Sequence, residues 1–131
     1  GYGFWGEYLQ AKSFSELAQD VKTFFKVDGF RMTNFDPSNK PIRRVAFAPG
    51  KGTSFIDAAL GAQCELFVTG EVGYHASMDA MRRGLAVIEL GHSESERFFV
   101  STVEGWLSEG GFTAVGLGPS AQKLWRGEHK Q

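Results

Sequence analysis

Two short apolar segments constrain the fold of this chain more than any other feature of its sequence. Residues 66–68 and 85–88 are apolar throughout, and each segment leads through a glycine into a loop. Their length is typical of buried strands. Because the ends of strands and the starts of helices carry the reactive groups of α/β folds, we expect functional residues in these two loops.

Both loops carry the same pair of side chains, a histidine followed four residues later by a carboxylate. The pairs are His75 with Asp79 and His92 with Glu96, and they contain two of the three histidines of the chain. Residues four apart share one face of a helix, so the two members of each pair are expected to point the same way. An imidazole and a carboxylate together suit zinc, manganese or iron.

The pair of His92 and Glu96 has two interpretations. Either the two side chains ligate a divalent metal ion, or they form an ordinary pair at the start of a helix. For His75 we favour a hydrogen-bonding role that orients its neighbours, and for Asp79 a position on the helix surface. A catalytic zinc typically uses about three protein ligands. Further ligands would therefore come from Glu71 or His75, from a symmetry mate, or from chain that is absent here.

Strands and helices alternate along most of the sequence. A capping box at residues 13–16 begins a predicted helix at 14–25, whose apolar residues recur at helical spacing. The other predicted elements are strands at 30–33, 42–48, 66–69, 85–90 and 112–117, and helices at 55–62, 74–83 and 93–108. This order predicts an α/β fold with a mostly parallel or mixed sheet covered by helices.

The two ends of the chain and one internal loop are less regular. Residues 1–9 contain three glycines and four aromatic residues, and we interpret them as an irregular or extended segment. Residues 118–131 are mostly polar, and we expect a mobile tail. The loop at 49–54 lacks the glycine and the Ser/Thr of a Walker A motif. It is a tight turn from a strand into a helix, or a backbone site for an anion.

The composition indicates one globular domain that spans residues 1–131. The net charge of −1 gives no signal for nucleic-acid binding. A membrane span needs roughly 18 consecutive apolar residues, and the sequence has no such run. Cys64 is the one cysteine, which excludes an internal disulfide, fits a reducing compartment and suggests a small buried side chain. We therefore expect a cytoplasmic protein without a signal peptide.

Several short motifs occur in a specific order. They are Gly1, Gly3, Gly6 and Glu7; residues 45–52; residues 69–71; Tyr74 and His75 with Asp79 and Ala80; and residues 91–93 with Glu96 and Arg97. In this order and spacing the chain resembles the Nif-three-like family, whose members are often labelled GTP cyclohydrolase one type two homologues. An arginine common in the first family motif is Phe4 here, and the tail does not match the family.

The resemblance implies one half of a two-lobed fold, the C-terminal half. Members of the family resemble two related α/β halves around a dinuclear metal centre and assemble into hexamers. The metal ligands that carry over to this sequence are His92 and Glu96. The remaining ligands would belong to the missing first half or to a partner subunit. We also expect self-association.

Two classes of function follow from these expectations. In the first, the intact protein is a metal-dependent hydrolase, and Glu71 or His75 acts as a base or orients the ligands. In the second, the chain is a non-catalytic domain for oligomerisation or partner binding, without a complete metal site. Stoichiometric metal binding that is lost in His92→Ala and Glu96→Ala distinguishes the first from the second.

Overall fold

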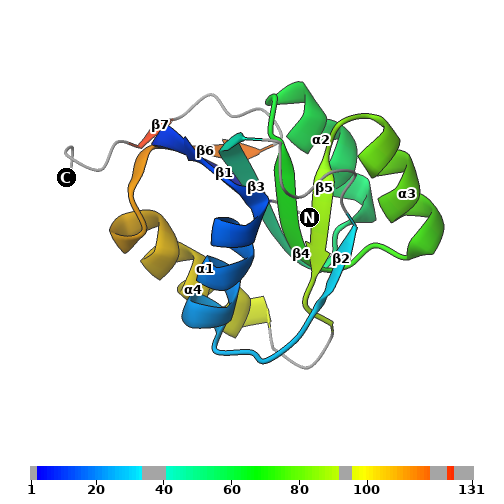
Figure 1. The fold of residues 1–131 in the computed structure, drawn as a ribbon, viewed down its shortest axis with the longest axis horizontal. Coiled ribbons are helices and arrows are strands. Elements are labelled where there is room, and N and C mark those ends of the chain that lie inside the picture. Colours follow the sequence, from blue (N-terminus) through cyan, green and yellow to red (C-terminus); the bar gives the residue numbers. More distant parts are fainter. Residues whose placement is uncertain (1–2, 34–40, 92–95, 119–123, 126–131) are drawn as a thin grey trace.

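A single mixed sheet with helices on both faces organises the chain (Figure 1). The computed structural model describes residues 3–33, 41–91, 96–118 and 124–125. The elements are β1 (Gly3–Lys12), α1 (Phe14–Phe25), β2 (Arg31–Thr33), β3 (Ile42–Lys51), the 3₁₀ turn η1 (Thr53–Phe55), α2 (Ile56–Gly61), β4 (Leu66–Glu71), α3 (Tyr74–Arg82), β5 (Ala86–Glu89), α4 (Glu96–Glu109), β6 (Phe112–Gly118) and β7 (Leu124–Trp125). The predicted α/β class and mixed sheet are confirmed.

The strands formed by these described residues lie in the order β2-β5-β4-β3-β1-β6-β7. The three central strands β3, β4 and β5 are parallel to one another. On one side β2 pairs with β5 in the antiparallel sense, and on the other side β1 pairs antiparallel with both β3 and β6. The helical connections between the parallel strands place the carboxyl ends of β4 and β5 at the same edge of the sheet.

Helix α1 has the bounds that the sequence predicts, because its start is specified locally. The Ser13 hydroxyl accepts a hydrogen bond from the Glu16 N–H at 3.1 Å, and the Glu16 carboxylate accepts one from the Ser13 N–H at 2.8 Å. This capping box satisfies two backbone donors that the helix leaves without partners. The helix ends at Phe25, and Lys26 after it adopts a left-handed conformation with φ +57°.

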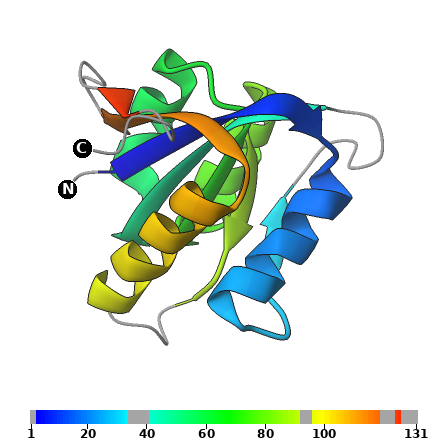
Figure 2. The same ribbon diagram turned by 90° about the vertical axis from the view of Figure 1, so that its left-hand side faces the viewer.

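The two faces of the sheet carry different helices. Helices α1 and α4 cover one face and lie side by side across it (Figure 2), and α2 and α3 cover the other. Two clusters of buried side chains fill these layers. The first contains Tyr8, Phe25, Phe47, Trp106 and Phe112 with aliphatic neighbours, and the second contains Trp5, Ala46, Ala48, Phe55, Ala59, Phe67 and Ala80 with theirs.

Strand β1 is more regular than the sequence alone indicates. The first residues of the chain form a ten-residue strand between β3 and β6, where an irregular or extended segment was expected. The glycines fit because aromatic rings occupy the space that a side chain would fill. A Cβ at Gly6 would lie 2.6 Å from the Phe112 ring, and one at Gly116 would lie 2.3 Å from the Trp5 ring.

Strand β3 is also longer than predicted, and it includes part of the glycine-rich loop. Its pairing with β4 shifts register between Ala48 and Lys51, and Gly50 has φ +66°. The Gly52 N–H then donates to the Glu71 carbonyl at 2.9 Å, so this loop joins β3 to the end of β4. None of the described helices is long and apolar enough to cross a membrane.

Candidate functional site

The carboxyl ends of β4 and β5 lie next to each other in a fixed register. Thr69 pairs with Glu89, the Leu90 N–H donates to the Thr69 carbonyl at 2.9 Å, and the Gly91 N–H donates to the Gly70 carbonyl at 2.8 Å. The pairing therefore continues past the end of β5 to Gly91, the residue before His92. The two loops that the sequence analysis singled out leave the sheet from this edge.

A surface depression of about 390 Å³ lies over these strand ends. It is lined by Phe30, Arg31, Gly70, Glu71, Glu89, Leu90 and Gly91. In open α/β sheets, ligands bind outside the carboxyl ends of the strands. This volume also lies in the range of small-molecule sites, roughly 300–1,000 Å³. The depression is therefore the candidate functional site of the described residues.

Glu89 is the buried charge of this site, with only 4% of its surface exposed. Its Oε2 accepts hydrogen bonds from the N–H groups of Val72 at 2.8 Å and Gly73 at 3.1 Å. Its Oε1 lies 3.4 Å from Nε of Arg31, whose side chain is 64% exposed. Sequence reasoning missed Glu89, and the signal that could have found it is a lone carboxylate in the apolar run 85–90.

Glu71 is the predicted site residue that reaches the depression. It is the last residue of β4, it is half-buried, and it lines the depression together with Glu89. Its backbone carbonyl accepts the hydrogen bond from the Gly52 N–H. The prediction that Glu71 approaches the edge of the sheet agrees with this position, and its catalytic role stays a prediction.

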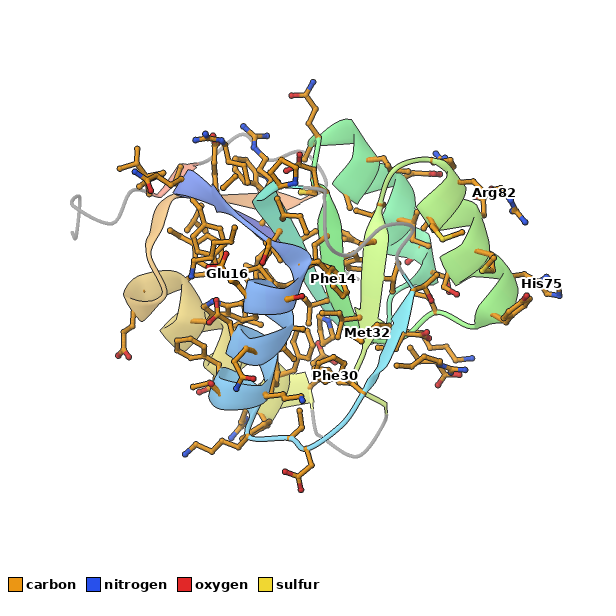
Figure 3. The ribbon with its side chains drawn as sticks, viewed as in Figure 1. Phe14, Glu16, Phe30, Met32, His75 and Arg82 are labelled. Atoms are coloured by element: carbon orange, nitrogen blue, oxygen red, sulfur yellow. The ribbon has the colours of Figure 1, made fainter. Side chains whose placement is uncertain are left out.

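His75 and Asp79 lie away from the depression, on the exposed side of α3. Figure 3 shows His75 on the outer side of the helix, where its ring contacts that of Tyr74 at 5.5 Å between centroids. The Asp79 carboxylate is 3.3 Å from the Arg83 guanidinium, which also reaches Asp57 at 2.9 Å. Asp79 is thus the surface residue that the sequence suggested. A role of His75 as base or orienting group stays a prediction.

The second pair is described only in part. His92 lies outside the described residues. Glu96 is the first residue of α4 and is exposed. It lines a second depression, of about 440 Å³, with other residues on the outer side of α4. Among the described residues, no group of three or more histidine, cysteine, aspartate and glutamate side chains is arranged to hold a metal ion.

Cys64 is buried, as the sequence suggested, and lies in the cluster under α2. Burial raises the pKa of its thiol to about 12. The thiol is therefore protonated at neutral pH, and a protonated thiol is a poor nucleophile. Cys64 takes no part in the candidate site.

The fold and the site define a class of protein: a mixed α/β domain whose acidic groups gather at the carboxyl ends of parallel strands. The chain belongs to the family described as Duf34/NIF3 (NGG1p interacting factor 3), which it matches over residues 1–117. It is 38% identical over 103 residues to a Streptococcus pneumoniae protein named GTP cyclohydrolase 1 type 2 homolog, covering 77% of this chain and 38% of that protein. It is 35% identical to the Escherichia coli protein of the same name, covering 80% of this chain and 42% of that protein.

Solved structures support the same relationship. The fold is similar to that of a Bacillus cereus protein related to NIF3, with a TM-score of 0.67, 29% identity and coverage of 83% of this chain and 29% of that chain. A Staphylococcus aureus protein aligns with a TM-score of 0.64 and 26% identity over 80% of this chain and 33% of that chain. The chain spans about two fifths of the length of the curated relatives named above.

Proposed function

We propose that this chain supplies His92 and Glu96 as ligands of a divalent metal ion in a metal-dependent hydrolase. The observation that carries the proposal is the fixed register at the ends of β4 and β5. It brings Gly91, the residue before His92, to the depression that Glu71 and Glu89 line. The proposal is supported by the family to which the chain belongs, since its relatives are named as homologues of a cyclohydrolase.

The donor groups fit a divalent ion. An imidazole nitrogen and a carboxylate oxygen are ligands that zinc, manganese and iron accept. The Glu96 side chain is exposed, and no ion pair or hydrogen bond joins its carboxylate to another part of the chain that the structure describes. A bound ion supplies a Lewis acid for hydrolysis.

The chain's own groups have separate roles in this proposal. Glu71 lines the depression and is the candidate base for a proton released there. His75 is a second candidate base, and its exposure on α3 makes it accessible to a partner chain. Because two ligands hold an ion weakly, the remaining ligands of a dinuclear centre belong to chain outside this sequence, or to another subunit of a self-associated, cytoplasmic protein.

A second candidate function is a non-catalytic domain for oligomerisation or partner binding. The observation in its favour is the exposure of four large apolar side chains. They are Leu9 at 67%, Met32 at 50%, Tyr74 at 67% and Phe98 at 39%. Under this alternative His92 and Glu96 have no metal to bind.

Paramagnetic broadening by Mn²⁺ tests the first proposal even when binding is weak. Titration of the ¹⁵N-labelled chain with Mn²⁺ should broaden the amide signals of residues 91–97 before all others, and a His92→Ala/Glu96→Gln variant should lose this selectivity. The matched control is His75→Ala/Asp79→Asn, which removes the same spacing from α3 and should retain the effect. Uniform broadening in the wild-type chain, or selectivity that survives in the first variant, would contradict metal ligation and favour the second candidate function.

A further inference from the structure

The depression over the ends of β4 and β5 has features that call for a ligand of its own. We propose that it binds a small organic cation whose charged group is planar and carries several N–H donors, an amidinium or a guanidinium. Such a ligand does not depend on a metal ion at His92 and Glu96, so the inference goes beyond the proposed function. Three features of the depression support it: an unfilled acceptor, the balance of charge, and an apolar wall with an aromatic ring.

The unfilled acceptor is one carboxylate oxygen of Glu89. Its Oε2 accepts hydrogen bonds from the N–H groups of Val72 and Gly73, but no donor in the described part of the chain forms a hydrogen bond with Oε1. The ion-pair partner of Oε1 is Nε of Arg31 at 3.4 Å, beyond the usual N–H···O range of about 2.7–3.2 Å. Glu89 is only 4% exposed and lines the depression. A buried ionised oxygen without a hydrogen bond is costly, so Oε1 favours a donor that enters from the depression.

The balance of charge in the depression is negative. Glu71 and Glu89 both line it, and the burial of Glu89 leaves little water to screen its carboxylate. Among the described lining residues the positive group is that of Arg31, whose side chain is 64% exposed. Solvent screens an exposed charge far more than a buried one. The depression therefore favours a cation over an anion.

The apolar wall selects the shape of that cation. Phe30 and Leu90 line the depression and pack against the aromatic cluster on their other side, and both are partly buried. An aromatic ring attracts a cation that lies on its face, and a planar, weakly hydrated guanidinium-like group stacks better than an ammonium. The volume of about 390 Å³ is that of a small-molecule site. Arg31, which already directs a guanidinium N–H towards Oε1, shows the kind of group that this oxygen attracts.

Benzamidine and its neutral isostere benzamide are the probes that test the inference. Each is titrated into the ¹⁵N-labelled chain in the presence of EDTA. We expect benzamidine to shift the Nε–H signal of Arg31 and the amide signals of Val72, Gly73 and Gly91, with a dissociation constant of about 1 mM. Benzamide should bind about 10-fold more weakly, because hydrogen bonds to a carboxylate are stronger when the donor is charged.

Three substitutions, each titrated where amide dispersion shows the variant to be folded, give different expected results. Glu89→Gln keeps one oxygen for the N–H groups of Val72 and Gly73 but puts a donor in place of Oε1, so benzamidine affinity should fall by about 10-fold or more. Arg31→Gln removes a competing cation, so affinity should rise by about threefold. Asp79→Asn is the matched control, because it removes the same charge from the exposed side of α3, and it should keep the affinity within about twofold.

Equal affinity for the two probes, or binding that survives in Glu89→Gln, would overturn the inference and make the binding adventitious. Weaker binding in Arg31→Gln would also overturn it, as would the absence of shifts at about 10 mM benzamidine. Because EDTA removes divalent ions, none of these outcomes affects the proposed ligation of a metal ion by His92 and Glu96. Uniform Mn²⁺ broadening, in turn, would contradict the proposed function and leave this inference intact.

Discussion

The two faces of the sheet differ in the length of the helices that cover them and in the size of the side chains packed between. On one face, two long helices of 12 and 14 residues, α1 and α4, cover a cluster that includes Tyr8, Trp106 and five buried phenylalanines. On the other, helices of 6 and 9 residues, α2 and α3, pack over a cluster with several alanines. The first cluster therefore contains more large aromatic side chains than the second.

The two faces also differ in what they contribute to the protein. We expect the aromatic face to contribute more to stability, because large rings bury more area and interact with one another. The small-residue face carries the helix that starts beside the candidate site, and its β4–α3 loop is held by Glu89. Small side chains there let short connections run close to the sheet. The candidate site draws on both layers, because Glu96 begins α4 on the aromatic face and the depression is also lined by Phe30 and Leu90, which pack against the aromatic cluster.

The largest expected effect comes from a pair of matched phenylalanines on adjacent strands. Phe47 contacts Trp106 and Phe112 on the aromatic face, with centroids 5.1 and 6.2 Å away, and Phe67 contacts Phe55 on the other at 5.7 Å. Truncation of a buried phenylalanine to alanine lowers the free energy of unfolding by about 3–5 kcal/mol. We expect Phe47→Ala to lower it by about 1 kcal/mol more than Phe67→Ala, because it loses one more aromatic pair. Urea denaturation measures both values, and an equal or larger effect in Phe67→Ala would break the comparison of the two faces.

A smaller effect is expected from the hydroxyl of Tyr8. Trp106 Nε1 donates a hydrogen bond to this hydroxyl at 3.1 Å, and both side chains are buried. Tyr8→Phe leaves the indole N–H without an acceptor, which should lower the free energy of unfolding by about 1–3 kcal/mol. Tyr74→Phe is the control on α3, where the ring is 67% exposed. A change there of more than about 0.5 kcal/mol would be unexpected for a surface position.

The smallest effect concerns Cys64 on the small-residue face and appears only in alkali. Burial raises the thiol pKa to about 12, whereas the pKa of a thiol in the unfolded chain is about 8.5. The unfolded state therefore releases a proton that the folded state keeps, and stability falls as the pH rises from about 8.5 towards 12. Between pH 8 and 10 the wild-type chain should lose on the order of 1 kcal/mol more than Cys64→Ala.

Denaturant titrations at several pH values measure this difference. Burial also raises the pKa of Tyr8, but this effect is common to the wild-type chain and to Cys64→Ala and cancels between them. Parallel pH profiles of the two proteins would show that the thiol ionises normally in the folded state. That result would mean that α2 covers the sheet more loosely than its buried contacts indicate.

The sequence predicted the elements whose signals are local. Helix α1 was predicted with its observed bounds because the capping box and the apolar spacing both lie within it. Strands β4 and β5 were found from their apolar runs, within one or two residues of their observed ends. In each case the residues that specify the element are close together in the chain.

The sequence could not predict what depends on distant contacts. Strand β1 was expected to be irregular or extended because glycines weaken a strand, and Gly3 and Gly6 are accommodated by the rings of Phe55 and Phe112, which lie far from them in sequence. Glu89 was missed because its partners, Arg31, Val72 and Gly73, lie far from it in sequence. Of the predicted site residues, Glu71 lies in the depression and His75 does not. The ligation by His92 and Glu96 stays a prediction.

The position of β1 has a consequence for how the chain folds during synthesis. Strand β1 is synthesised before both of its partners, and it pairs with β3 on one side and with β6, roughly a hundred residues later, on the other. Closure of such a distant pair is slow, because the entropy of the intervening loop is lost before the contact forms. Until β6 emerges, one edge of β1 stays open to pairing with other chains. The nascent chain is therefore exposed to misassembly at this edge from the synthesis of β1 until that of β6.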